Sequence, residues 1–250
     1  MKYWHQCIKE NDSEISILLY IENFLSDDNL MICENWLKKR YYDGDFIGES
    51  SKINESEIER YSRKQMWFQE DKEYFCNLWK ERHKRWESYE YDRTLQYIQE
   101  LVQTKILDNI KHSMFSIELH ELSKYYKGIL DTRFNFNSCL VNVYENGNEG
   151  ISPHRDCLDS FGLYPTIVGL SIGATRHMKI KRIVFNENNI LSMKNDNDPK
   201  NKGLSMELPL QNNSVFIMMG ASQKYYTHEI IKEPEIKDKR FSLTFRQWKG

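Results

Sequence analysis

The sequence predicts a mainly β core of the jelly-roll or barrel type that follows a helical N-terminal part. From about Phe134 onward, short segments rich in Val, Ile, Tyr and Phe alternate with turn residues. Before that point, apolar residues recur at helical spacing. The chain of 250 residues corresponds to one large domain or two small ones, and either can bury a stable core.

The N-terminal part contains one clearly marked helix. Residues 27–40 place apolar side chains at helical spacing, and Asp27 can cap the first turn. Residues 43–59 are polar with glycines and serines, which indicates a loop. The charged run at residues 80–86 fits a solvated helix face or a basic contact surface. The first interpretation is favoured, because charge runs usually only solvate an element.

The C-terminal half has the pattern of strands. Five segments alternate or form short apolar runs bounded by turn signals: residues 137–144, 166–172, 177–183, 214–219 and 240–246. Residues 186–203, rich in Asn, Asp and Lys, indicate a long surface loop between strands.

Charge and cysteine content limit the partners and the compartment. Lys and Arg number 35 against 37 Asp and Glu, so a nucleic-acid surface must be a local patch. Five scattered cysteines without a CxxC pair favour neither a disulfide framework nor structural zinc, and they indicate a reducing compartment. No apolar run approaches the ~20 residues that cross a bilayer. We therefore expect an intracellular monomer, in the cytoplasm or nucleus, without a membrane partner.

Three side chains form a candidate metal site. His154 and Asp156 are two residues apart, so in a strand both can reach one ion. His228 lies 72 residues beyond Asp156, at a place where a lone histidine is more often packed or exposed than a ligand. Two imidazoles and one carboxylate are a ligand set that holds Fe(II) and leaves positions open for a co-substrate and O2.

The last predicted strand suggests the co-substrate. Its alternate positions are polar, and they are Arg240, Ser242, Thr244 and Arg246. A solvent-facing strand could show this pattern, but arginine also suits carboxylates because its planar fork donates two parallel hydrogen bonds. Asn142 and Tyr144 share the same two-residue spacing. Together with the metal site, these residues predict an iron-dependent oxygenase that uses the dicarboxylate 2-oxoglutarate.

In this order, the motifs resemble the AlkB-type 2-oxoglutarate- and Fe(II)-dependent dioxygenases, specifically the members that repair nucleic acid. The segments that carry the resemblance are residues 134–144, 150–156, 165–176, 226–228 and 240–246. They span roughly residues 118–248, about half of the chain. Residues 63–68 are only loosely similar, to the stretch that feeds the family's nucleotide-recognition lid.

The resemblance implies a double-stranded β-helix over residues 118–250, after a helical extension with the lid over residues 1–117. It implies that His154, Asp156 and His228 bind iron. It also implies that Arg240, with Tyr144 and Ser242, holds the distal carboxylate of 2-oxoglutarate, while Asn142 and Arg246 lie near the proximal carboxylate and the metal. Ser242 stands where relatives often carry asparagine.

The implied reaction is oxidative demethylation of an N-alkylated base in DNA or RNA, such as 1-methyladenine or 3-methylcytosine. It would consume O2 and 2-oxoglutarate and release succinate, CO2 and formaldehyde. The candidate substrate contacts are Trp67 and Phe68 for base stacking, Arg176 as a polar contact, and Lys179 and Lys181 for phosphates. The structural alternatives are a core aromatic for Trp67 and a solvated strand face for the two lysines, whereas Arg176 rests on its match to a motif of the family.

The sequence leaves other functions open. Relatives that act on alkylated bases commonly carry an acidic residue two positions after the iron-binding aspartate, where this chain has Leu158, followed by Asp159. The same chemistry on a modified RNA base or a protein side chain is therefore an alternative. An alternative of another class is a catalytically silent nucleic-acid-binding module, which the complete set of metal and co-substrate residues disfavours.

Overall fold

The computed structural model describes residues 3–44, 63–70, 88–112, 114–126, 135–185, 191–192 and 205–249. The predicted loops at residues 43–59 and 186–203 lie almost entirely outside these ranges, and the charged run at residues 80–86 lies wholly outside them. Among the described residues, no helix is both long enough and apolar enough to span a bilayer.

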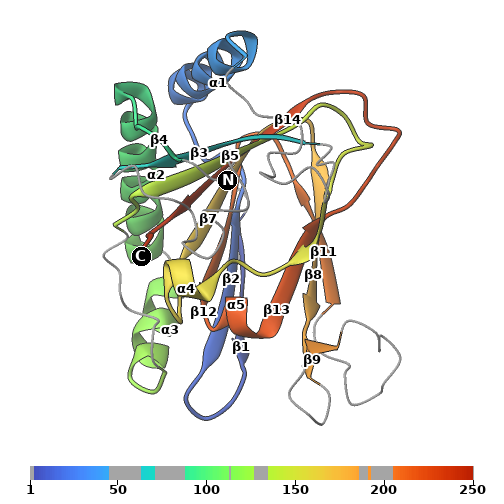
Figure 1. Cartoon of the computed structure of the whole chain (residues 1–250). Coiled ribbons are helices and arrows are strands. Elements are labelled where there is room, and N and C mark those ends of the chain that lie inside the picture. The colour runs from blue at the N-terminus through green and yellow to red at the C-terminus, as the bar shows by residue number, and fades with distance from the viewer. Residues whose placement is uncertain are drawn as a thin grey trace.

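Two β-sheets form the core (Figure 1), which confirms the predicted mainly β architecture. The larger sheet has the strand order β1 (Tyr3–Lys9), β2 (Ile15–Ile21), β12 (Ser214–Gly220), β7 (Ile167–Gly173), β14 (Arg240–Arg246), β5 (Ser138–Tyr144), β3 (Lys64–Gln69) and β4 (Ser88–Tyr89). The smaller sheet has the order β11 (Ser205–Leu210), β8 (Arg176–Arg182), β13 (Tyr226–Ile230) and β6 (Ile151–His154). A separate pair consists of β9 (Val184–Phe185) and β10 (Leu191–Ser192).

Three helices cover one face of the larger sheet, as Figure 1 shows. They are α1 (Asp27–Tyr42), α2 (Arg93–His112) and α3 (Met114–Ser123). Apolar side chains of the helices, such as Trp36 and Val102, pack with sheet residues such as Leu243 in one buried cluster, which we call the outer core. We call the face that carries Leu243 the outer face of the sheet and the opposite face the inner face.

The inner face lies against the smaller sheet. Leu18 and Phe216 of the larger sheet form a second buried cluster with Ile180 and Leu208 of the smaller sheet. Two short helices, α4 (Leu158–Phe161) and α5 (Ser222–Tyr225), follow strands of this region in the chain. The polar residues of β14 and β5 lie between the two sheets, because each strand alternates its side chains between the two faces.

The N-terminal half is not a purely helical extension. It supplies β1, β2, β3 and β4 to the larger sheet in addition to helices, and β2 pairs with β12, a strand of the C-terminal half. All seven residues of β2 are buried. Because β2 is covered on both faces, its residues are apolar apart from Ser16, and periodicity alone does not assign such a run to a strand. The helix at residues 27–40 and the five predicted strands are confirmed.

Candidate active site

The structure brings the three candidate metal ligands together at the end of the smaller sheet. His154 of β6 pairs directly with His228 of β13, and their ring centroids are 4.3 Å apart. Asp156 follows β6, and its Oδ1 lies 4.0 Å from His154 Nε2 and 3.9 Å from His228 Nε2. One donor atom from each residue falls within 4.8 Å of the others, so a single ion can contact all three.

Hydrogen bonds around the three ligands leave one atom of His154 and one of Asp156 for a metal. His154 Nδ1 lies 2.9 Å from the Ser152 carbonyl oxygen, which can only accept, so the ring donates there and Nε2 keeps its lone pair. Asp156 Oδ2 accepts a bond of 2.5 Å from Arg246 Nε, which leaves Oδ1 toward the imidazoles. The buried His228 Nδ1 has no hydrogen-bond partner.

The ligands are in the protonation states that a metal requires. Burial lowers the pKa of His154, and burial together with the neighbouring His154 lowers the pKa of His228 to about 3. Burial alone would raise the pKa of Asp156, but Arg246 and the two imidazoles outweigh it and hold that pKa below its ordinary value. At neutral pH the site therefore presents two neutral imidazoles and a carboxylate.

Asp156 is held from two sides. Arg246, on the inner face of β14, binds its carboxylate, and Gln223 Oε1 of α5 accepts a bond of 2.9 Å from its backbone N–H. Arg246 therefore lies at the metal end, as the resemblance implies. Gln223 was not predicted, since nothing in the local sequence around α5 points toward Asp156.

Arg240 is a buried guanidinium that is incompletely satisfied. It is 2% exposed, and its Nη2 donates to Ser171 Oγ over 2.8 Å. Its Nε and Nη1 have no hydrogen-bond partner, and no described carboxylate forms an ion pair with it. Burial lowers the pKa of this guanidinium, which shows that the cation stands in an unfavourable environment. A carboxylate ligand would satisfy both the charge and the unpaired donors.

The neighbours of Arg240 form a polar patch on the inner face of the larger sheet. In the sheet register, Arg240 lies opposite Tyr144, and Ser242 lies opposite both Asn142 and Ser171. The Arg240 guanidinium carbon is 5.2 Å from the Tyr144 ring centroid. The predicted residues of β5 and β14 thus share one patch. Ser171 belongs to it as well, and only the pairing of β7 with β14 reveals that.

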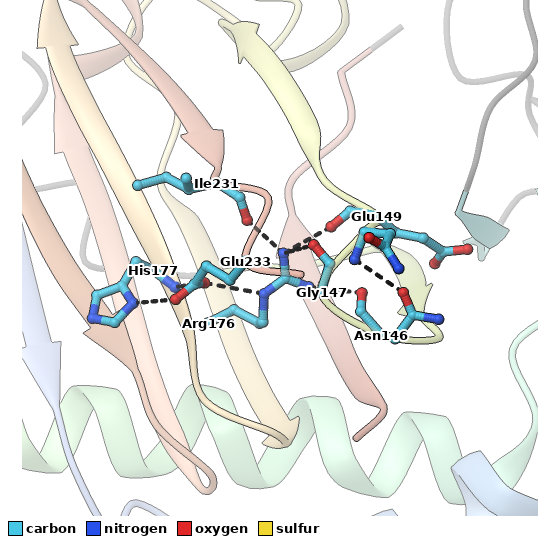
Figure 2. A network of polar contacts seen from close by, with 8 residues as sticks. Asn146, Gly147, Glu149, Arg176, His177, Ile231 and Glu233 are labelled. Atoms are coloured by element: carbon cyan, nitrogen blue, oxygen red, sulfur yellow. Dashed lines mark hydrogen bonds and ion pairs between the residues drawn. The ribbon is translucent and has the colours of Figure 1, made fainter. Parts of the chain in front are cut away.

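Arg176 is a structural clamp, which corrects the predicted substrate contact (Figure 2). Its side chain is fully buried at 0% exposure. Its Nε donates to Glu233 over 3.1 Å, and its terminal nitrogens donate to backbone carbonyls; the acceptors are those of Asn146, Gly147, Glu149 and Ile231. The guanidinium joins the loop after β5 to the loop after β13 and is enclosed by these bonds.

Trp67 and Phe68 are neighbours on β3 and therefore point to opposite faces of the sheet. Phe68 is fully buried in the outer core, with its ring centroid 5.7 Å from that of Trp36. The prediction that Phe68 stacks on a base is wrong, because it faces the helices. Trp67 lies on the inner face and packs with Leu140 and Phe161.

Lys179 and Lys181 alternate on β8 with Ile180, which lies opposite His228. The two lysines therefore point to the far face of the smaller sheet, away from the metal ligands, where Lys179 has Glu207 and Glu229 as cross-strand neighbours. Any contact they make with phosphate is made outside the pocket. Asp159 is exposed on α4, and Leu158 is half-buried.

These residues fit an iron centre with a dicarboxylate beside it. The triad is compact and has the right protonation states, and the unsatisfied donors of Arg240 lie on the inner face that also carries Arg246. His154, Asp156 and His228 would hold the metal, and Arg240 with Tyr144, Ser242 and Asn142 would hold the co-substrate.

Comparison with known proteins agrees with this geometry. The family model described as the 2OG-Fe(II) oxygenase superfamily matches residues 18–246. The alpha-ketoglutarate-dependent dioxygenase alkB homolog 3 of Bos taurus is 33% identical over 116 residues, which are 46% of this chain and 38% of that protein. The DNA oxidative demethylase ALKBH2 of Arabidopsis thaliana is 28% identical over 132 residues, which are 50% of this chain and 41% of that protein. The chain thus spans less than half the length of these relatives.

A similar fold occurs in a solved structure. It is a prolyl hydroxylase from Trichoplax adhaerens in complex with a peptide fragment of the hypoxia inducible factor oxygen degradation domain. The TM-score is 0.53 at 13% sequence identity, with coverage of 92% of this chain and 83% of that one. At this identity the likeness concerns the fold alone.

Proposed function

Because the chain belongs to the 2OG-Fe(II) oxygenase superfamily, we propose that it removes N-linked alkyl groups from bases in DNA or RNA by oxidation. The resemblance to the AlkB-type dioxygenases is confirmed by the relatives of that type. Fe(II), 2-oxoglutarate and O2 are the cofactors and co-substrates that this family requires.

One observation carries the proposal: a compact triad of metal ligands, two of them buried, shares its site with a buried guanidinium that has two unpaired donors. A protein that only bound nucleic acid would have no use for this arrangement, and unsatisfied buried donors cost stability. The site therefore argues for an enzyme rather than for a silent binding module. The relatives' names, and not the geometry, support a nucleic-acid substrate.

The side chains of this protein would bind and orient the reactants. Arg246 keeps Asp156 ionised and fixes which of its oxygens faces the metal. Arg240 would fix the far carboxylate of 2-oxoglutarate through its free Nε and Nη1. When bound, iron and 2-oxoglutarate would supply the oxidising chemistry, in which 2-oxoglutarate is converted to succinate and CO2. One oxygen atom of O2 enters succinate and the other hydroxylates the N-methyl group, which leaves as formaldehyde.

The substrate's reactive base would have to leave its stack to reach this buried site, and a damaged or unpaired base costs less to extract than a normal one. Trp67 on the inner face is the remaining candidate for stacking. The recognition lid in the N-terminal part, the division of the chain near residue 117, the monomeric state and the intracellular location stay predictions.

The test is a screen of methylated oligonucleotides. Purified protein with Fe(II), 2-oxoglutarate and O2 should release formaldehyde and succinate from DNA or RNA oligonucleotides that carry 1-methyladenine or 3-methylcytosine. Matched unmethylated oligonucleotides should release no formaldehyde. Absence of formaldehyde from every methylated oligonucleotide would refute the proposal, and succinate release driven instead by a peptide would favour the protein-side-chain alternative.

A further inference from the structure

Strand β3 places three polar or amphipathic side chains on the inner face of the sheet. Gln65, Trp67 and Gln69 occupy alternate positions, so they point to the same side. In the register with β5, Gln65 lies opposite Asn142, and Gln69 lies opposite Ser138. Asn142 lies opposite Ser242 on β14, and Ser138 lies opposite Arg246. The β3 row is therefore two strands away from the row of Arg240 and Arg246.

Both glutamines are buried and have no hydrogen-bond partner. Gln65 is 2% exposed and Gln69 is 0% exposed, and the amide oxygen and nitrogen of each are unpaired. Among the described residues, Gln99 and Gln223 are buried glutamines whose amides do have partners. Leaving buried amides unpaired costs free energy, so such groups require an explanation. Two nitrogens of Arg240 are in the same condition, and the partner proposed for them is the co-substrate.

The surroundings of this row are aromatic. The Trp67 and Phe161 rings meet edge to face, with centroids 6.3 Å apart, and Leu140 completes a small cluster against which Trp248 packs. The Arg246 guanidinium carbon lies 5.2 Å from the Phe161 ring centroid, and Arg246 binds the metal ligand Asp156. The cluster and Gln69 therefore adjoin the metal end of the site, whereas Gln65 lies level with Asn142 and Ser242.

We propose that Gln65 and Gln69 hydrogen-bond the edge of the substrate base while Trp67 contacts its ring. This inference rests on the proposed function and names the residues that recognise its substrate. A nucleobase offers an apolar face together with donors and acceptors on its edge, and an indole between two amides matches both features. The amides are enclosed, so the aromatic cluster must move to admit the base.

Position in the sheet assigns these amides to the base rather than to 2-oxoglutarate. The charged part of the co-substrate clamp lies on β14 and β7, where Arg240 meets Ser171. β5, which carries Asn142 and Tyr144, lies between that pair and β3. A dicarboxylate already has a cation and hydroxyl groups for its far end. The β3 row lies on the side of Arg240 opposite to β7, and we assign that side to the second reactant.

The test uses Gln65→Met and Gln69→Met, which keep the side-chain length and remove the amide. Each variant should raise the KM for a methylated oligonucleotide about tenfold, the effect of one hydrogen bond, while the KM for 2-oxoglutarate stays within twofold. Neither variant should lower the Tm, because the free protein loses no hydrogen bond. The matched control is Gln99→Met, which breaks partnered bonds on α2 and should lower the Tm without changing the KM for the oligonucleotide.

The outcomes separate the two proposals. Wild-type protein that forms no formaldehyde from any methylated oligonucleotide would overturn the proposed function, and this inference with it. With an active wild-type protein, an unchanged oligonucleotide KM in both methionine variants would overturn the inference alone. A rise in the KM for 2-oxoglutarate instead, or a fall in Tm as large as that of Gln99→Met, would also overturn it by showing a co-substrate or packing role.

Discussion

The two faces of the larger sheet use the same strands for opposite purposes. On the outer face, Val141, Val143, Leu243 and Phe245 are fully buried and pack against helices in the outer core. On the inner face, their immediate neighbours in the chain are polar apart from Leu140 and include the incompletely satisfied Arg240. Alternation within one strand therefore separates stabilising residues from ligand-binding residues.

The difference between the faces is energetic as well as chemical. Each apolar side chain of the outer face contributes free energy by leaving water, whereas unpaired amides and guanidinium nitrogens on the inner face cost free energy until a ligand arrives. Functional sites commonly carry such a cost. Substitutions on the outer face should therefore lower stability and spare binding, and substitutions on the inner face should do the reverse.

The largest expected effect is the loss of the metal. His154→Ala should reduce succinate formation about a thousandfold or more, because one of three iron ligands is gone. The His154 side chain is 32% exposed, so its truncation should leave the Tm nearly unchanged. The control is Arg155→Ala, which changes an exposed neighbour and should retain activity. Activity of His154→Ala above a tenth of the wild-type rate would contradict the ligand assignment.

The next effect tests the outer face. Leu243→Ala should lower the free energy of unfolding by about 3 kcal/mol, because it removes a fully buried side chain and leaves a cavity. Urea denaturation measures this change. The KM for 2-oxoglutarate, measured well below the unfolding temperature, should remain that of the wild type. A changed KM without lost stability would show that the two faces are not energetically separate.

Arg240 tests the inner face at a residue of the same strand. Arg240→Met should raise the KM for 2-oxoglutarate about a hundredfold, since it removes the charge-assisted bonds to one carboxylate. Its Tm should not fall, because the guanidinium has two unpaired nitrogens in the free protein. Isothermal titration with 2-oxoglutarate gives an independent readout. An unchanged affinity would show that the carboxylate is held elsewhere.

The smallest expected effect is a pH dependence of stability. The pKa of His228 is lowered to about 3 by burial and by His154, while an unfolded histidine titrates near 6.5. Below that value the unfolded chain takes up a proton that the folded protein does not. The metal-free protein should therefore be fully stable above neutral pH and lose about 1 kcal/mol between pH 7 and 5.5.

The comparison for this prediction is His228→Gln, which removes the titrating group. Urea unfolding in EDTA at both pH values should show a smaller loss of stability for the variant than for the wild type. Equal losses in the two proteins would show that His228 is not the source of the pH dependence.

Residues in the C-terminal half could be predicted well, because their signals are local. The strict alternation of residues 240–246 fixes which side chains share a face, and the spacing of His154 and Asp156 allows both to reach one metal. The N-terminal strands could not be predicted as well. The run at residues 15–21 is apolar apart from Ser16, and only its pairing with β12 identifies it as a strand of the larger sheet.

Substrate residues were the least predictable part of the site. Trp67 and Phe68 look alike in the sequence, and only the orientation of β3 sends one toward the site and the other into the outer core. Arg176 lies in a motif of the family, and yet its guanidinium donates its hydrogen bonds to loop carbonyls. Ser171 and Gln223 reach the site through strand pairing and a helix end, which local patterns do not encode.

The sequence by itself determined the ligand types, the alternation that puts them on one face, and the family to which the chain belongs. The tertiary structure decided that His228 meets His154 across two strands far apart in the chain, and that two amides on β3 stand unpaired on the inner face of the larger sheet. The physical reason is the distance along the chain over which each kind of interaction acts. Side-chain direction along a strand follows from the covalent chain, whereas proximity and the satisfaction of buried polar groups depend on which strands pair.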